Sequence, residues 1–212
     1  MKLVRMLAVC AVFGCIPQMM AQKWEIGGGA GVGFYTSHDI TSPAGTANAK
    51  IKTNVAATAW VGSNSGTRWG GELRYGYQLG DLRLKQGSTE ATFGAQSHVI
   101  HYDFLYHFAD RGSAVRPYIN FGAGIKIYRG TGEEVVFQPL SRIALLTRAQ
   151  DLVPVVSVGA GIKMKLSDSL QLRLSVNDYL TPFPSEVIVP VSGSVDSWVN
   201  DIVPMVSLAY TH

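Results

Sequence analysis

A group of histidines around one aspartate contains the residue types best suited to chemistry. His101 and Asp103 could form a general base and the carboxylate that orients it. A serine from another segment, Ser157 or Ser175, could supply the nucleophile. His101 and His107 share a face but lie six residues apart, which is about 20 Å along an extended strand and too far for one ion. The pattern therefore keeps a hydrolase as one hypothesis and predicts no metal site.

No cofactor is predicted either. The glycine-rich run 27–33 has the composition of a phosphate-binding loop, but no helical pattern follows it. Its alternate glycines instead suggest space for large side chains opposite, such as Arg74 or Tyr118.

Composition limits the class of protein. The chain has 212 residues, 47% hydrophobic and 16% charged, with 23 glycines and a formal charge of +3. This length suits one all-β domain, and the high apolar content argues against disorder. Without Lys2 and Arg5 the charge falls to +1, with the remaining charges scattered along the chain, so nucleic acid is not an expected partner.

The first 21 residues are predicted to be a secretory signal peptide. A basic start is followed by an apolar stretch from Met6 to Ile16, too short to span a membrane, and then by a cleavage region ending at Ala21. A lipoprotein signal with Cys15 as the lipidated residue is the alternative. Both cysteines precede the predicted cleavage site, so the expected mature domain, residues 22–212, contains no disulfide.

Period-two alternation runs through the rest of the chain and predicts the elements that position these side chains. Each alternating segment has one apolar and one polar face, with the charged residues assigned to the polar face. Eight segments follow this rule: Lys23–Tyr35, Ala49–Val61, Arg68–Leu79, Val99–Phe108, Arg116–Tyr128, Pro154–Leu166, Leu170–Tyr179 and Asp201–Tyr210.

The polar faces would make a poor dry core, because they carry charges and many glycines. Placing the apolar faces toward lipid and the polar faces inward satisfies both sets. We therefore predict an all-β fold, an eight-stranded antiparallel up-and-down transmembrane β-barrel with short periplasmic turns and longer outer loops. The predicted outer loops are Thr36–Asn48, Gly80–His98, Arg129–Val153 and Leu180–Asn200.

Aromatic residues near the strand ends predict two girdles at the membrane interfaces. The periplasmic girdle would contain Trp24, Trp69, Phe108 and Tyr210, and the outer girdle Phe34 and Tyr77. Trp60 points inward by strict alternation, and we interpret it as the mark of a bulge.

The inward charges form the most informative group. The facing rule directs ten cations (Lys23, Lys50, Lys52, Arg68, Arg74, Arg116, Lys126, Lys163, Lys165 and Arg173) and four carboxylates (Glu25, Glu72, Asp103 and Asp201) into the lumen. An eight-stranded barrel is just wide enough for side chains to fill. We therefore predict a charge network that plugs the lumen, formed by Glu72, Arg74, Asp103 and Arg173. A basic periplasmic mouth would be formed by Arg68, Arg116, Lys163 and Lys165.

With this pattern the chain resembles a known family, the small bacterial outer-membrane β-barrels that include the OmpA transmembrane domain and OmpX. The resemblance rests on the eight-strand pattern and on the segments Trp24–Tyr35, Arg116–Tyr118, Phe121–Gly124, Arg173–Tyr179 and Asp201–Pro204. It implies an outer-membrane location, contact with outer-membrane lipid, and insertion by the barrel-assembly machinery. That machinery commonly reads a C-terminal aromatic residue, whereas this chain ends in Tyr210-Thr211-His212.

Three functions remain open. The first is a non-enzymatic structural or surface-interacting barrel with a filled lumen and an unknown surface partner. The second is a narrow anion-preferring pore, and the third is a lipid-modifying hydrolase. Two outer loops are unusually apolar, at Leu140–Leu146 and Thr181–Val191. These could form a folded lid, a partner-binding patch or an extension of the strands.

Overall fold

A computed structural model describes residues 24–63, 67–192, 195 and 197–212. The predicted signal peptide and the inward-facing Lys23 lie outside these residues. Within them, eight strands close into an antiparallel barrel in the order β1-β14-β12-β11-β9-β8-β5-β4. The barrel strands are β1 (Trp24–Tyr35), β4 (Asn54–Ser63), β5 (Trp69–Leu79), β8 (Ala95–His107), β9 (Val115–Gly130), β11 (Gln150–Lys165), β12 (Leu170–Pro182) and β14 (Trp198–Thr211). The predicted fold class is confirmed.

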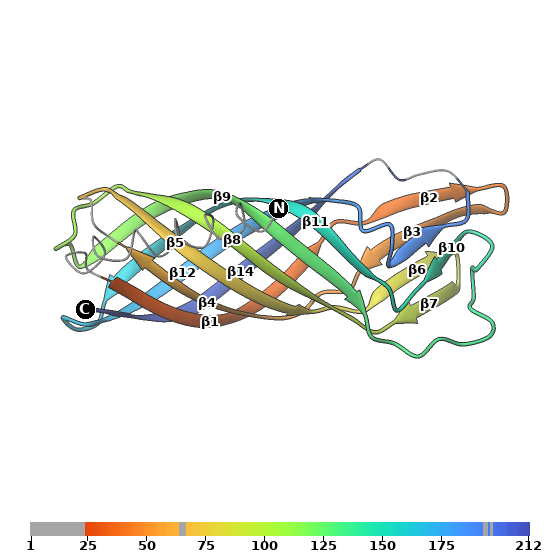
Figure 1. Cartoon of the computed structure of the whole chain (residues 1–212), viewed down its shortest axis with the longest axis horizontal. Helices are drawn as coiled ribbons and strands as arrows, with labels where there is room; N and C mark the ends of the chain where they lie inside the picture. Colours follow the sequence, from red (N-terminus) through yellow and green to blue (C-terminus); the bar gives the residue numbers. More distant parts are fainter. Residues whose placement is uncertain (1–23, 64–66, 193–194, 196) are drawn as a thin grey trace, which may run out of the picture.

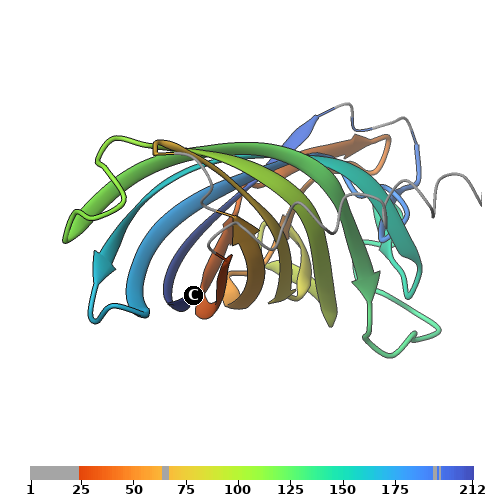
Figure 2. The same ribbon diagram turned by 60° about the vertical axis from the view of Figure 1, so that its left-hand side comes forward.

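The strands tilt around the barrel axis, and β1 pairs with β14 to close the wall (Figures 1 and 2). Closure pairs the backbone groups of both strands, for example through the register Ile26↔Tyr210, and leaves no sheet edge facing hydrocarbon. Short connections link β8 to β9 and β11 to β12 at one end. This short-turn end carries the C-terminus and is turned forward in Figure 2.

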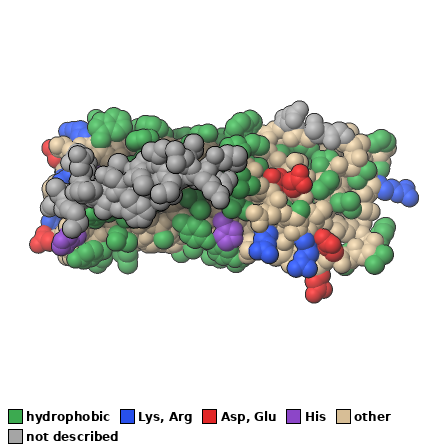
Figure 3. All heavy atoms as spheres, viewed as in Figure 1, with side chains coloured by type: hydrophobic (Ala, Val, Ile, Leu, Met, Phe, Trp, Pro, Cys, Tyr) green, Lys and Arg blue, Asp and Glu red, His purple; other side chains and the backbone are tan. Residues whose placement is uncertain are grey.

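Alternation places apolar side chains outside and polar side chains inside, as predicted. In β8, Ile100, Tyr102 and Phe104 are exposed on the outer face, whereas His101 and Asp103 are buried. In Figure 3 hydrophobic side chains line the upper and lower borders of the barrel half, and charged ones lie at its short-turn end and on the part beyond the barrel. Among the described residues, no helix is long and apolar enough to cross a membrane.

The other end carries a folded structure that we call the cap. It consists of a four-stranded sheet, a two-stranded sheet and the segments that connect them (Figure 1). The four-stranded sheet has the order β2-β3-β6-β7, and the other pairs β10 with β13. The cap strands are β2 (His38–Ser42), β3 (Gly45–Ile51), β6 (Leu82–Gln86), β7 (Thr89–Phe93), β10 (Ala144–Leu146) and β13 (Ile188–Pro190).

The cap has its own hydrophobic core, which continues onto the mouth of the barrel. Leu84 from the larger sheet and Ile188 from the smaller one are fully buried in it. Tyr35, Tyr128 and Val153 from the barrel strands belong to the same cluster. The two apolar loop segments, Leu140–Leu146 and Thr181–Val191, contain β10 and β13 and so form part of the cap. Removing their aliphatic side chains from water stabilises the cap.

Three sequence-based expectations were wrong. The segment 49–61 is not one strand but belongs to β3 and β4, so Lys50 and Lys52 lie in the cap and not in the lumen. Trp60 points inward without a bulge, because the pairing of β4 with β1 and β5 is continuous there. The alternation rule assigned charged residues to the inward, polar face, but Asp178 lies on the outer face of β12, where Asn200 donates a hydrogen bond to it at 2.8 Å.

Candidate functional site

The buried charges of the lumen form the candidate functional site, and Glu72 lies at its centre. Arg173 donates two hydrogen bonds to the Glu72 carboxylate, from Nη1 to Oε2 at 2.8 Å and from Nη2 to Oε1 at 2.9 Å. Arg74, two residues along β5, also donates to Oε1. All three side chains are almost fully buried. Such paired hydrogen bonds fix the guanidinium plane. They also link β5 and β12, which lie on opposite sides of the barrel.

Two aromatic rings enclose the Arg173 guanidinium. Its carbon lies 4.8 Å from the centre of the Trp60 ring and 4.5 Å from that of Tyr118, whose hydroxyl accepts from Nε. Glycines make this possible, since a Cβ on Gly27 would overlap Trp60 and one on Gly161 would overlap Tyr118. Trp60, which we had interpreted as a bulge, is therefore a packing partner of the network.

Asp103 links Arg74 of the network to His101 and Asn120. His101 Nδ1 lies 2.9 Å from its Oδ1, and Asn120 donates to its Oδ2 at 3.0 Å. Arg74 Nε lies 3.9 Å from the same Oδ2. The pair that the sequence suggested as base and orienter is thus in contact. Within the described residues, however, the Ser157 hydroxyl has no hydrogen-bond partner and does not engage His101.

Glu25 and Lys163 form a buried ion pair between the network and the short-turn end. Lys163 Nζ donates to both carboxylate oxygens, at 2.9 and 2.7 Å. Trp60 Nε1 also donates to Glu25 at 3.4 Å, and Arg173 Nη1 lies 3.9 Å from it. Lys163 therefore extends the network and does not contribute a solvated charge to a mouth.

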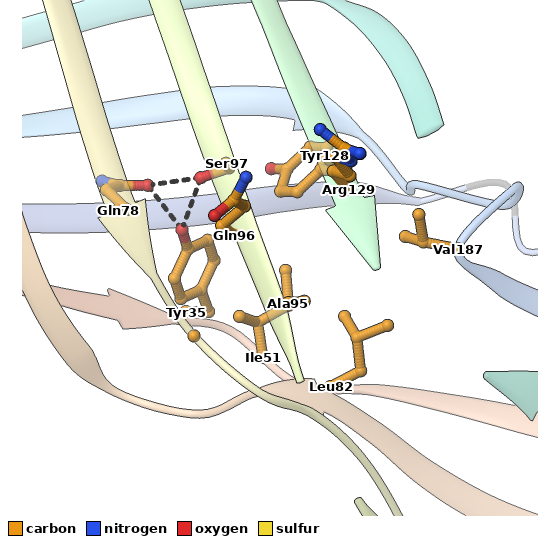
Figure 4. Close-up of a pocket in the computed structure, with 11 residues that line it drawn as sticks. Tyr35, Ile51, Gln78, Leu82, Ala95, Gln96, Ser97, Tyr128, Arg129 and Val187 are labelled. Carbon is orange, nitrogen blue, oxygen red and sulfur yellow. Dashed lines mark hydrogen bonds between the residues drawn. The ribbon is translucent and has the colours of Figure 1, made fainter. Parts of the chain in front are cut away.

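A second cluster closes the lumen below the cap. Lys126 Nζ donates to Asp201 at 2.5 Å and to Gln78 at 2.9 Å. The rings of Tyr35, Tyr128 and Tyr179 surround the ammonium at 4.9, 5.0 and 5.7 Å from their centres. Figure 4 shows how Tyr35, Gln78 and Ser97 form a triangle of hydrogen bonds beside the cap residues Ile51 and Leu82.

The remaining residues of the predicted basic mouth lie at the short-turn end. Arg68 and Lys165 are exposed there and pair with Asp110 and Asp168. Arg116 is buried and donates to the carbonyls of residues 109 and 67. These contacts satisfy the three cations locally.

The predicted excess of ten cations over four carboxylates was wrong. Among the described residues, the charged side chains buried in the barrel are five cations (Arg74, Arg116, Lys126, Lys163 and Arg173) and four carboxylates (Glu25, Glu72, Asp103 and Asp201). Arg116 belongs to the turn end, so the interior proper contains equal numbers of each sign. Lys50 and Lys52 lie in the cap, because the alternating segment 49–61 spans the end of β3 and the start of β4. Arg68 and Lys165 are exposed at the short-turn end.

The aromatic residues assigned to the girdles lie on the outer face. Trp69, Phe108 and Tyr210 are exposed at the short-turn end, and Trp24 is half-buried there. Phe34 is exposed near the cap, where Tyr77 is half-buried. Trp198, which the sequence assigned to a loop, is exposed at the cap end of β14. In the part of the chain that the structure describes, no three His, Cys, Asp or Glu side chains form a group that could hold a metal.

Comparisons with known proteins agree with this architecture. A family model described as the outer membrane protein beta-barrel domain matches residues 6–184. The chain belongs to this family. Its location is therefore the outer membrane, and the long connections that form the cap are expected outside the cell. A search of curated proteins found no match.

Solved structures of other outer-membrane proteins share the fold of this barrel. Neisserial surface protein A is 10% identical, with a TM-score of 0.57 over 89% of this chain and 96% of that chain. OprG from Pseudomonas aeruginosa is 15% identical, with a TM-score of 0.59 over 90% and 96%. Ail of Yersinia pestis, in complex with a heparin analogue, is 12% identical, with a TM-score of 0.54 over 90% and 99%.

Sequence reasoning missed several members of the lumen clusters. Tyr35, Gln78 and Tyr179 were not singled out, although each has the inward parity of its strand. The inward parity of Trp60 was also visible, and a large ring opposite the glycines of β1 was the available signal.

Proposed function

We propose that this outer-membrane barrel is non-enzymatic, with a closed lumen, and that its role is structural or surface-interacting through the cap. The observation that carries the proposal is the filled interior. Arg173 joins Glu72 across the lumen, and Lys126 joins Asp201 nearer the cap, with aromatic rings packed around both cations. A barrel of eight strands has little space left once such side chains fill it.

A narrow anion-preferring pore receives less support. Anion preference needs unpaired cations along the path, whereas Arg74, Lys126, Lys163 and Arg173 each have a carboxylate within ion-pair distance. The cap core also packs onto the barrel mouth through Tyr35 and Tyr128. Both features argue against continuous passage of ions.

A lipid-modifying hydrolase also receives less support. Such an enzyme must present its catalytic groups to lipid, but the His101 and Asp103 side chains are directed into the lumen and are fully buried. The geometry lacks a serine hydrogen-bonded to His101 among the described residues.

The outer face of the barrel would have two partners. Outer-membrane lipid would contact the apolar band and its girdles, and the barrel-assembly machinery would bind during insertion. Leu208 and Tyr210 support the second contact, since both are exposed on the outer face at the end of β14. No nucleic-acid partner is proposed.

Proteoliposomes test both alternatives in one preparation. The refolded chain is reconstituted with phospholipid and lipid A, and ion efflux and the mass of every lipid are measured together. The proposal predicts efflux equal to that of protein-free vesicles and unchanged lipid masses. Chloride-selective efflux would favour the pore, and the appearance of deacylated lipid would favour the hydrolase.

A further inference from the structure

A group of polar side chains lies on the outer face of the barrel where β8 and β9 reach the cap. Gln96 and His98 alternate with the buried Ser97 and Val99, so they point outward. Arg129 on β9 is exposed and is the register neighbour of Gln96. Figure 4 includes both Gln96 and Arg129.

The position of this group is set by the outer girdle. Tyr77 is the register neighbour of His98, and Gln96 and Arg129 lie one residue pair further toward the cap. Below them, the outer face of the same strands carries Ile100 and Ile125. The group therefore lies where hydrocarbon gives way to lipid headgroups.

Two tyrosines orient the donors. The Tyr75 hydroxyl lies 2.8 Å from His98 Nδ1; when it donates to that atom, the ring proton sits on Nε2. The Tyr77 hydroxyl donates to Gln96 Oε1 at 2.9 Å, which leaves the Gln96 NH₂ group as a donor. Among the described residues, no acceptor forms a hydrogen bond with His98 Nε2 or with Gln96 Nε2.

Arg129 adds a permanent positive charge. None of the ion pairs or side-chain hydrogen bonds among the described residues involves its guanidinium. Asp151, on the neighbouring strand, is engaged elsewhere and accepts a hydrogen bond from the backbone N–H of Glu186 at 3.0 Å. A guanidinium that has no partner among the described residues and lies at a membrane interface is suited to binding an anionic oxygen group of a ligand.

We propose that Gln96, His98 and Arg129 bind the phosphate of an anionic lipid in the outer leaflet. Three donors, one of them charged, match the several acceptor oxygens of a phosphate group. A lipid is the source favoured by position, because the apolar strip below the donors would contact the acyl chains of the same molecule.

Native mass spectrometry of the refolded full chain tests this site with three probes: diphosphoryl lipid A, its dephosphorylated form and inorganic phosphate. Hydrogen bonds to charged groups contribute about 1.5–3 kcal/mol each, which corresponds to about tenfold or more in affinity. We expect diphosphoryl lipid A to bind at least about tenfold more tightly than the dephosphorylated form, and H98F/R129Q to remove that difference.

Arg142→Gln is the matched control. Arg142 is also exposed and without an ion pair among the described residues, but it lies in the cap next to β10. We expect R142Q to bind lipid A as the wild type does. The proposal is overturned if H98F/R129Q keeps the preference for phosphate, if R142Q loses it equally, or if millimolar inorganic phosphate displaces the lipid. The last result would show a site for free anions.

Discussion

Replacing Glu72 by glutamine should destabilise the barrel strongly. The Glu72 carboxylate is the shared acceptor of Arg173 and Arg74, and both guanidiniums are almost fully buried. E72Q keeps the shape of the side chain but removes its charge. Among the described residues, the carboxylate that Arg173 then retains nearby is that of Glu25, at 3.9 Å from Nη1.

The magnitude follows from the burial of the two cations. Removing one partner of a buried ion pair typically costs about 3–5 kcal/mol, because a desolvated charge loses its counter-ion. The aromatic rings of Trp60 and Tyr118 contact Arg173 in the wild type and in the variant, so their contribution cancels in the difference. We therefore expect the free energy of unfolding to fall by about 3–5 kcal/mol.

Urea unfolding of the refolded protein in lipid vesicles, followed by tryptophan fluorescence, measures this change. The matched control is Glu90→Gln in the cap, where Glu90 pairs with Lys52 at 3.2 Å and both side chains are more than one third exposed. An exposed pair contributes about 0–1 kcal/mol, so E90Q should be close to wild type. Equal stabilities of E72Q and E90Q would refute the claim that the lumen network supports the barrel.

Three further predictions concern packing and pH dependence. Gly27→Ala places a methyl group against an indole ring and should cost about 1–3 kcal/mol, whereas Gly112→Ala enters open space and should stay within about 0.5 kcal/mol in the same urea assay. Leu84→Ala should destabilise the cap by about 2–5 kcal/mol, measured by hydrogen exchange of the cap strands, and the exposed Leu145→Ala should not. Burial lowers the pKa of His38, so the folded cap favours its neutral ring and loses stability as the pH falls below about 6.5. H38Q should remove that pH dependence of cap exchange, and a dependence that survives in H38Q would contradict this assignment.

The sequence was sufficient for the barrel and for the orientation of most of its side chains. Alternation is a local property of each strand, so it assigns Glu72, Arg74, Asp103 and Arg173 to the lumen without knowledge of the fold. These four residues do lie close together, although the role of their network remains a prediction. The same reasoning failed at Lys50, because a strand pattern does not reveal where the barrel ends and the cap begins.

The pairing of distant charges could not be obtained in the same way. Glu25 meets Lys163 across 138 positions of sequence, and Lys126 meets Asp201 across 75. Which inward side chains meet depends on strand tilt and register, and alternation contains neither. From the sequence, a folded lid was one of three alternatives for the apolar loops, because the cap strands are only three to seven residues long and each is too short for a clear period-two signal.

Single-channel recording of the refolded wild-type chain in a planar bilayer tests the central claim most directly. Folded protein is first verified by the changed electrophoretic mobility of the unheated barrel. A lumen filled by the Glu72 and Lys126 clusters predicts no discrete current steps at neutral pH. Reproducible steps with anion preference would contradict the closed lumen and favour a basic conducting path.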